Sequence, residues 1–235
     1  MFVCSCGQNL GSSGGQVEKV KAVVLTGGHG FAKEPFFAMF DSFEDIEYVE
    51  AAHEKDLTIF DDVSGWDRDV IVMYNMGQEI TAEQKANFIK LLNDGVGLVA
   101  MHHNIGAFQG WPEYRKIIGG KWYSKAMEED GVMHGKSKYK HDLDISVRVE
   151  DSSHPITAGT GDFTIFDETY GDCFFESDNH VLLSTDHPTS DGPLGWVRKY
   201  GKARVCYIQM GHGVEAYENE NYRRLVNNTI KWCAN

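Results

Sequence analysis

The chain has 235 residues, of which 42% are hydrophobic, so it can bury the core of one large α/β domain. Asp and Glu (35) outnumber Lys and Arg (22), which gives a formal net charge of −13. This acidity argues against nucleic-acid or anionic-membrane partners, because both require a basic surface. No apolar run approaches the roughly 18 residues of a membrane span.

The first 20 residues are predicted to be a disordered segment that precedes a single domain over residues 21–235. Gly11-Ser12-Ser13-Gly14-Gly15 is typical of a flexible linker. Val3-Cys4-Ser5-Cys6 resembles the end of a bacterial lipoprotein signal with Cys6 as the acylated residue, although no apolar segment precedes it. The segment is either a truncated lipoprotein signal or a chance match. The predicted location is therefore either the bacterial cytoplasm or the periplasm. The five cysteines form no CxxC pair, so neither a disulfide framework nor a zinc ribbon is indicated.

In the first half of the domain, strands and helices are predicted to alternate. Strands are expected at residues 20–25, 46–51, 70–74 and 96–101, and helices at residues 35–43 and 81–93. Thr81 with Gln84 is a favourable helix start, and Gly95 follows the end of that helix. The alternation predicts a mainly parallel sheet with helices on both faces, in which the first, third and fourth strands are central neighbours.

After about Gly119 this alternation stops. Residues 121–140 are polar, with several Lys and aromatic residues, and are predicted to form a long functional loop. Strands are expected at residues 143–149, 163–166, 181–184, 194–198 and 205–209, with a hairpin at Tyr200-Gly201-Lys202 and a closing helix at residues 220–232.

Several of the ten histidines follow predicted strands, namely His29, His102, His103, His187 and His212. The C-terminal ends of parallel strands meet at one edge, where α/β folds bind ligands, so at least His29 and His102 should face a common cleft. Many α/β hydrolytic and amidotransfer folds hold a Ser or Cys nucleophile at such a strand-to-turn junction. His102 in that position indicates that the chemistry has changed, since imidazole can act as base, acid or metal ligand.

Two other motifs bear on the site. Asp167-Glu168-Thr169-Tyr170 follows a predicted strand and offers a carboxylate for acid–base chemistry or metal binding, although a solvated turn fits the motif equally well. Gly27-Gly28-His29-Gly30 matches neither a dinucleotide-binding motif nor a P-loop, so no nucleotide cofactor is expected. Aromatic residues in polar contexts, which could stack on sugars, are Trp111, Trp122, Tyr123, Tyr139 and Trp196.

The sequence resembles the trehalose-utilisation ThuA-like family over about residues 21–232. The motifs that carry the resemblance are Gly97-Leu98-Val99-Ala100-Met101-His102, Gly119-Gly120-Lys121, His154-Pro155-Ile156-Thr157, Asp167-Glu168-Thr169-Tyr170, Thr185-Asp186-His187-Pro188, and Tyr200-Gly201-Lys202 leading to Gly211-His212-Gly213. The resemblance implies a class I glutamine amidotransferase-like, flavodoxin-like fold with His102 where glutaminases carry their Cys. Glu168 and His212 also match family positions. Relatives are associated with disaccharide catabolism and often accompany oxidoreductases that make 3-keto sugars.

We therefore expect a sugar-active isomerase, lyase or hydrolase, and not a glutaminase, that acts on a sugar, keto-sugar or glycoside. His102, Glu168, His212 and His29 are the expected catalytic residues, and the same four are the candidate ligands of a divalent metal, with zinc favoured. Expected sugar contacts are His103, Asn104, Tyr170, His187, Trp111 and Trp196. The alternative is a non-catalytic carbohydrate-binding or regulatory protein on an amidotransferase-like scaffold. A Cys-dependent amidase is disfavoured because no Cys lies at a strand-to-helix junction. The sequence does not indicate the oligomeric state.

Overall fold

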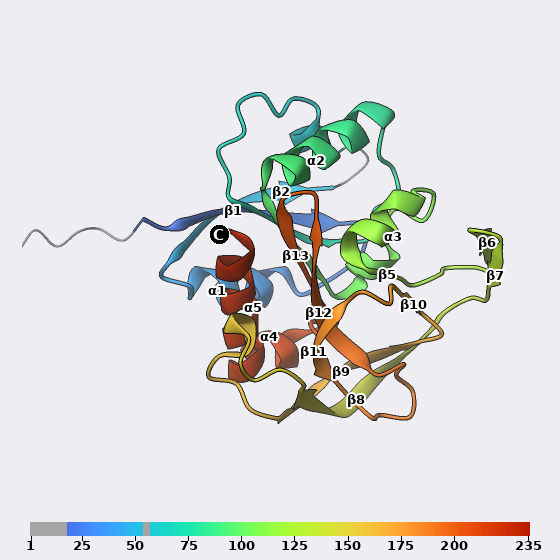
Figure 1. Cartoon of the computed structure of the whole chain (residues 1–235). Helices are drawn as coiled ribbons and strands as arrows, with labels where there is room; N and C mark the ends of the chain where they lie inside the picture. The colour runs from blue at the N-terminus through green and yellow to red at the C-terminus, as the bar shows by residue number, and fades with distance from the viewer. Residues whose placement is uncertain (1–17, 54–56) are drawn as a thin grey trace, which may run out of the picture.

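The computed structural model describes residues 18–53 and 57–235, and a nine-stranded sheet runs through the molecule (Figure 1). The strand order is β2-β1-β3-β4-β13-β12-β11-β8-β9. Its strands are β1 (Val20–Gly27), β2 (Ile46–Ala52), β3 (Val70–Asn75), β4 (Gly97–Met101), β8 (Lys138–Val149), β9 (Phe163–Gly171), β11 (His180–Ser184), β12 (Pro193–Tyr200) and β13 (Ala203–Ile208). Residues 1–17 of the segment predicted to be disordered, including Cys6, lie outside the described residues.

The remaining elements are short strands and helices. The small strands β5 (Gly120–Lys121) and β10 (Phe174–Phe175) pair together, as do β6 (Met127–Glu129) and β7 (Val132–His134). The helices are α1 (Lys33–Asp41), α2 (Ala82–Asp94), α3 (Pro112–Ile118), α4 (Val214–Glu218) and α5 (Glu220–Cys233), with 3-10 turns η1 (Thr58–Phe60), η2 (His102–Gly106) and η3 (Pro155–Thr157). No described helix has the length and apolar character that a membrane span requires.

The sheet is mixed, with a parallel core. β2, β1, β3, β4 and β13 pair in parallel, and β1, β3 and β4 are neighbours as predicted. β12, β11, β8 and β9 instead add on antiparallel, so the sheet is less parallel than expected. The tight turn at Tyr200-Gly201-Lys202 explains part of this difference, because a short hairpin can join only antiparallel strands. The α/β class is confirmed.

Helices cover both faces of the parallel core, as the sequence predicted. Alternate residues of β3 enter opposite cores: Val72 packs with α1 and α5, whereas Ile71 packs with α2 and α3. Every residue of β3 and β4 is buried, which is the pattern of central parallel strands.

A capping box closes the N-terminus of α2 at the helix start that the sequence predicted. The Thr81 side chain accepts a hydrogen bond from the Gln84 backbone, and the Gln84 side chain accepts one from the Thr81 backbone. We expect Thr81→Ala to lower the free energy of unfolding by about 1 kcal/mol, because the backbone N–H of Gln84 loses the hydroxyl that accepts its hydrogen bond. Thr81→Ser keeps the hydroxyl and should change it little. Urea unfolding of both variants tests this, and equal losses would contradict it.

The prediction of a loop at residues 121–140 is wrong from Met127 onward. It contains the β6–β7 hairpin, and β8 begins at Lys138 rather than at residue 143. Lys, Tyr and His residues occupy the start of β8, where several side chains are exposed, so the hydrophobic alternation that marks a half-buried strand is missing there. The long β8–β9 ribbon brings a carboxylate to the edge of the parallel core.

Candidate functional site

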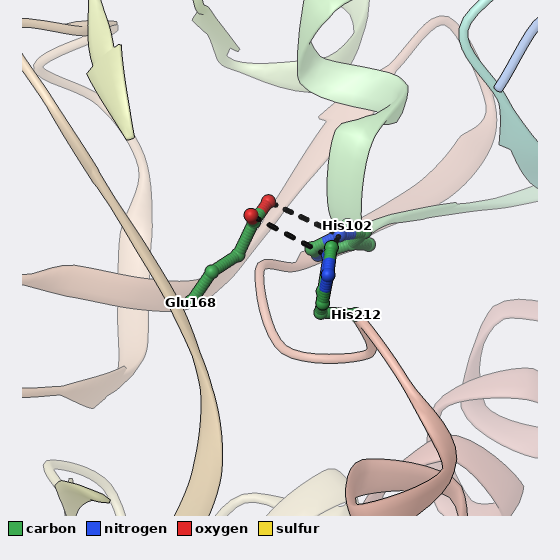
Figure 2. A group of neighbouring side chains, drawn as sticks. All are labelled: His102, Glu168 and His212. Atoms are coloured by element: carbon green, nitrogen blue, oxygen red, sulfur yellow. Dashed lines mark hydrogen bonds and ion pairs between the residues drawn. The ribbon is translucent and has the colours of Figure 1, made fainter. Parts of the chain in front are cut away.

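The site forms where two neighbouring parallel strands end. Met101 of β4 pairs with Ile208 of β13, and both strands point the same way. His102 comes directly after β4, and His212 lies in the short segment after β13, so both reach the same edge. Figure 2 shows the Glu168 carboxylate, which comes from β9, pointing at these two imidazoles.

His102 sits in a strained turn. Its φ is 52°, in the left-handed region that residues with a side chain rarely adopt. Such a strand-to-helix turn is also what presents the nucleophile in α/β hydrolases. The Tyr207 hydroxyl donates a 2.8 Å hydrogen bond to the His102 carbonyl and helps to hold this conformation.

The hydrogen bonds of His102 define which ring nitrogen carries the hydrogen. The side chain is 1% exposed, and Nδ1 lies 2.8 Å from the carbonyl oxygen of Gln209. Because a carbonyl can only accept, Nδ1 carries the hydrogen and the neutral ring keeps a lone pair on Nε2. Nε2 lies 3.2 Å from Glu168 Oε1 and 3.3 Å from His212 Nδ1. The Tyr170 hydroxyl also lies 3.3 Å from Nε2, so this lone pair can accept a hydrogen bond from these neighbours or, in their place, bind a metal ion.

Burial sets the protonation of the group. It holds the pKa of His102 well below its usual value and raises the pKa of Glu168 to about 7. An ionised Glu168 would place two lone pairs against each other at 3.2 Å. A proton or a cation between them relieves this repulsion.

Asp167 builds the backbone around the group. Its carboxylate is buried and accepts hydrogen bonds from the backbone N–H groups of Gly211 (2.7 Å), His212 (3.1 Å) and Glu168 (2.8 Å). Burial raises its pKa to about 7, and these hydrogen bonds oppose the rise. Asp167 thus ties β9 to the segment that carries His212.

One nitrogen each from His102 and His212 and one oxygen from Glu168 lie within 4.8 Å of one another. Three nitrogen and oxygen donors at such spacing can hold a metal ion such as zinc. The donor set fits, because the Nε2 lone pair of His102 faces the other two ligand atoms.

A cavity of about 170 Å³ adjoins this group, and Glu168 belongs to both. Imidazole, carboxylate and aromatic side chains line most of it; the lining residues are His29, Met76, His103, Ile105, Gly106, Trp122, Tyr139, His141, Glu168 and Tyr170. The mixture of rings and hydrogen-bonding groups is typical of a small-molecule site.

Three residues predicted for the site line this cavity without joining the three-residue group. His29 and His103 have ring centroids 4.5 Å apart, and the Tyr170 hydroxyl lies 3.3 Å from both ring nitrogens of His102. His103 is buried and donates to the Tyr74 carbonyl through Nε2. The structure therefore places His29, predicted as a ligand, beside His103 instead.

The other four predicted sugar contacts lie outside the cavity. Asn104 is fully buried, and its amide is bonded to Asn75 and Tyr114. Trp111 and Trp196 belong to the hydrophobic core. His187 is bonded to Thr189. Burial explains three of these placements, because aromatic and amide groups in polar stretches can still point inward.

Sequence reasoning missed His141 altogether. This residue lies on β8, with Nδ1 2.6 Å from Glu168 Oε2. It lies between the loop predicted to end at residue 140 and the strand predicted to begin at residue 143, and the polar start of β8 has no hydrophobic alternation that would mark a strand.

Solved structures share this fold at low sequence identity. A ThuA-like protein from Parabacteroides merdae superposes with a TM-score of 0.76 and 16% identity, covering 92% of this chain and 90% of that one. A ThuA-like protein from Bacteroides uniformis gives 0.65 and 20%, covering 93% and 92%. A β-galactosidase from Bacillus circulans gives 0.54 and 11%, covering 92% of this chain but 31% of the galactosidase. No curated protein matches the sequence significantly.

The family comparison agrees with the motifs around the site. The sequence matches the family described as ThuA, trehalose utilisation, over residues 21–233, which includes the strands and loops that carry His102, Glu168 and His212. The match spans almost the whole of the described domain. The chain therefore belongs to the ThuA trehalose-utilisation family.

Proposed function

We propose that this protein is an enzyme of carbohydrate metabolism that acts on a sugar, a keto-sugar or a glycoside. The observation that carries the proposal is the group of His102, Glu168 and His212, of which His102 and Glu168 are buried, next to a cavity that Glu168 lines. The cavity of about 170 Å³ is smaller than the roughly 300–1,000 Å³ of drug-sized ligand sites, so it suits a small ligand such as one sugar ring. Membership in the trehalose-utilisation family supports a sugar ligand.

Acid–base chemistry on a keto-sugar fits the protonation of the group. A ketone acidifies its neighbouring C–H bonds, so a positioned base can remove such a proton near neutral pH. The base would be the pair of His102 and an ionised Glu168. His102 Nε2 presents the lone pair, and Glu168, 3.2 Å away, takes over the proton and can return it, because burial raises its pKa to about 7. The same pair could assist departure of a glycosidic oxygen.

His102, Glu168 and His212 would hold a divalent metal, with zinc favoured because its protein ligands are nitrogen and oxygen donors like these. Three protein ligands leave one position for water or substrate, as in catalytic zinc sites. A bound metal would polarise the carbonyl oxygen of a keto-sugar. His29, His103 and Tyr170 would contact the sugar from the other walls of the cavity. We place the protein in the bacterial cytoplasm or periplasm.

Metal analysis with a chelator control is the experiment that tests this proposal. We expect the purified chain to contain about one equivalent of zinc, to lose it on dialysis against chelator, and to turn over 3-keto-trehalose or another keto-glycoside. Glu168→Gln should bind the metal much more weakly, because the neutral amide is a poorer ligand than a carboxylate. His187→Gln, a change outside the cavity, is the control and should retain it.

Two outcomes would change the conclusion. Turnover by metal-free protein that chelator does not inhibit would contradict the proposed metal site. The acid–base mechanism would then remain. A chain that binds disaccharide but holds no metal and turns over no keto-sugar would be a binding protein on an amidotransferase-like scaffold.

A further inference from the structure

An irregularity in the β8–β9 ribbon lies directly beside the site. Lys140 of β8 pairs with Thr169 of β9, and Leu143 pairs with Asp167. Two residues of β8, at positions 141 and 142, therefore oppose one residue of β9, which is a β-bulge. Asp142 has a φ of 59°, the left-handed conformation found at such irregularities. The bulge lies opposite Glu168, and bulges next to active sites often re-aim a side chain.

The two oxygens of Glu168 have different partners. Oε2 lies 2.6 Å from His141 Nδ1 and 3.4 Å from His212 Nδ1, whereas Oε1 lies 3.2 Å from His102 Nε2. A carboxylate free to rotate could turn either oxygen, or neither, toward His102. With Oε2 engaged by His141, Oε1 stays directed at the lone pair of His102.

The position of His141 suits this role better than a purely structural one. Its side chain is 42% exposed and lines the cavity, so its removal leaves no buried hole. Its ring centroid lies 4.5 Å from that of His212, on the cavity side of the group. His141 therefore contacts the group from outside the three mutually close ligand atoms.

We propose that His141 is a positioning residue that orients Glu168 for metal binding from the bulge of β8. This inference rests on the proposed metal site. Residues that orient metal ligands in this way typically change metal affinity about 10–100-fold when they are removed.

Cobalt binding tests the proposal independently of turnover. Co²⁺ is titrated into metal-free protein, and its visible absorption reports both affinity and coordination. We expect His141→Leu to raise the dissociation constant about 10–100-fold. His141→Asn, whose amide N–H lies near the place of Nδ1, should restore most of the affinity and keep the wild-type spectrum. His180→Leu is the control. It removes another His–carboxylate pair, in which His180 Nε2 lies 3.0 Å from Asp151 Oδ2, and should not change cobalt affinity.

Each alternative outcome overturns a different statement. Wild-type affinity in His141→Leu would exclude the positioning role while leaving the metal site intact. Equal losses of affinity in the Leu and Asn variants, with unchanged thermal stability, would show that the polar contact with Glu168 does not position it. An altered spectrum in His141→Asn would make His141 a ligand itself. If the wild-type chain binds no cobalt, the metal site fails, and the positioning role fails with it.

Discussion

His102→Ala is expected to lower turnover of a keto-glycoside by about 10²–10⁴-fold, the range that a general acid or base contributes. Its Nε2 faces both Glu168 Oε1 and His212 Nδ1, so its removal takes away the contacts that join these two side chains to the end of β4. The variant should also lose bound metal. The fold should persist, because the flanking β4 residues keep their packing. Steady-state kinetics, metal analysis and circular dichroism measure these three effects.

The controls for this prediction separate catalysis from folding. His154→Ala changes a histidine that caps η3, away from the cavity, and should retain activity. His102→Cys is expected to create no glutaminase activity. Normal turnover by His102→Ala would refute the catalytic role, and unchanged metal content would separately exclude His102 as an essential ligand.

Trp196→Ala is expected to lower the free energy of unfolding by about 3–5 kcal/mol, as typical for a large aromatic side chain removed from a core. Trp196 is 1% exposed, packs against Tyr207 at 4.5 Å between ring centroids, and donates to the Ile118 carbonyl. The loss combines a cavity, broken ring contacts and an unpaired carbonyl. Urea unfolding monitored by far-ultraviolet circular dichroism gives the value.

Tyr139→Ala is the matched comparison. Tyr139 is 56% exposed and lines the cavity, so its removal should change stability by no more than about 0.5 kcal/mol and weaken sugar binding. Below the unfolding transition, Trp196→Ala should bind sugar normally. The opposite result, a stable Trp196→Ala chain with impaired sugar affinity, would restore the stacking role predicted from sequence.

Regular local patterns made the parallel half of the fold predictable. The apolar run of β3 signals a strand buried on both faces, and Thr81 with Gln84 signals the start of α2. The antiparallel half carried weaker signals. The first residues of β8 are charged or polar, and their strand conformation depends on pairing with β9, which no local pattern reveals.

The site divides in the same way. His102 and His212 could be found because each follows a strand, and parallel strands share an edge. Glu168 was predicted from its motif after a predicted strand, although the pairing of β8 with β9 that brings it to the site was not. His141 escaped because its contact with Glu168 depends on the register of two strands. Trp196 was misplaced because a sequence does not show which way a ring points.

The position of β13 has a consequence for how the protein folds. β13 lies between β4 and β12, so it joins the parallel and antiparallel halves of the sheet, yet it is made near the end of the chain. Until residue 208 has left the ribosome, β4 keeps an unpaired edge that can associate with other chains. Pairings this distant in sequence also form slowly. His212 follows β13 in the chain, so the group of His102, Glu168 and His212 can assemble only after β13 has been synthesised.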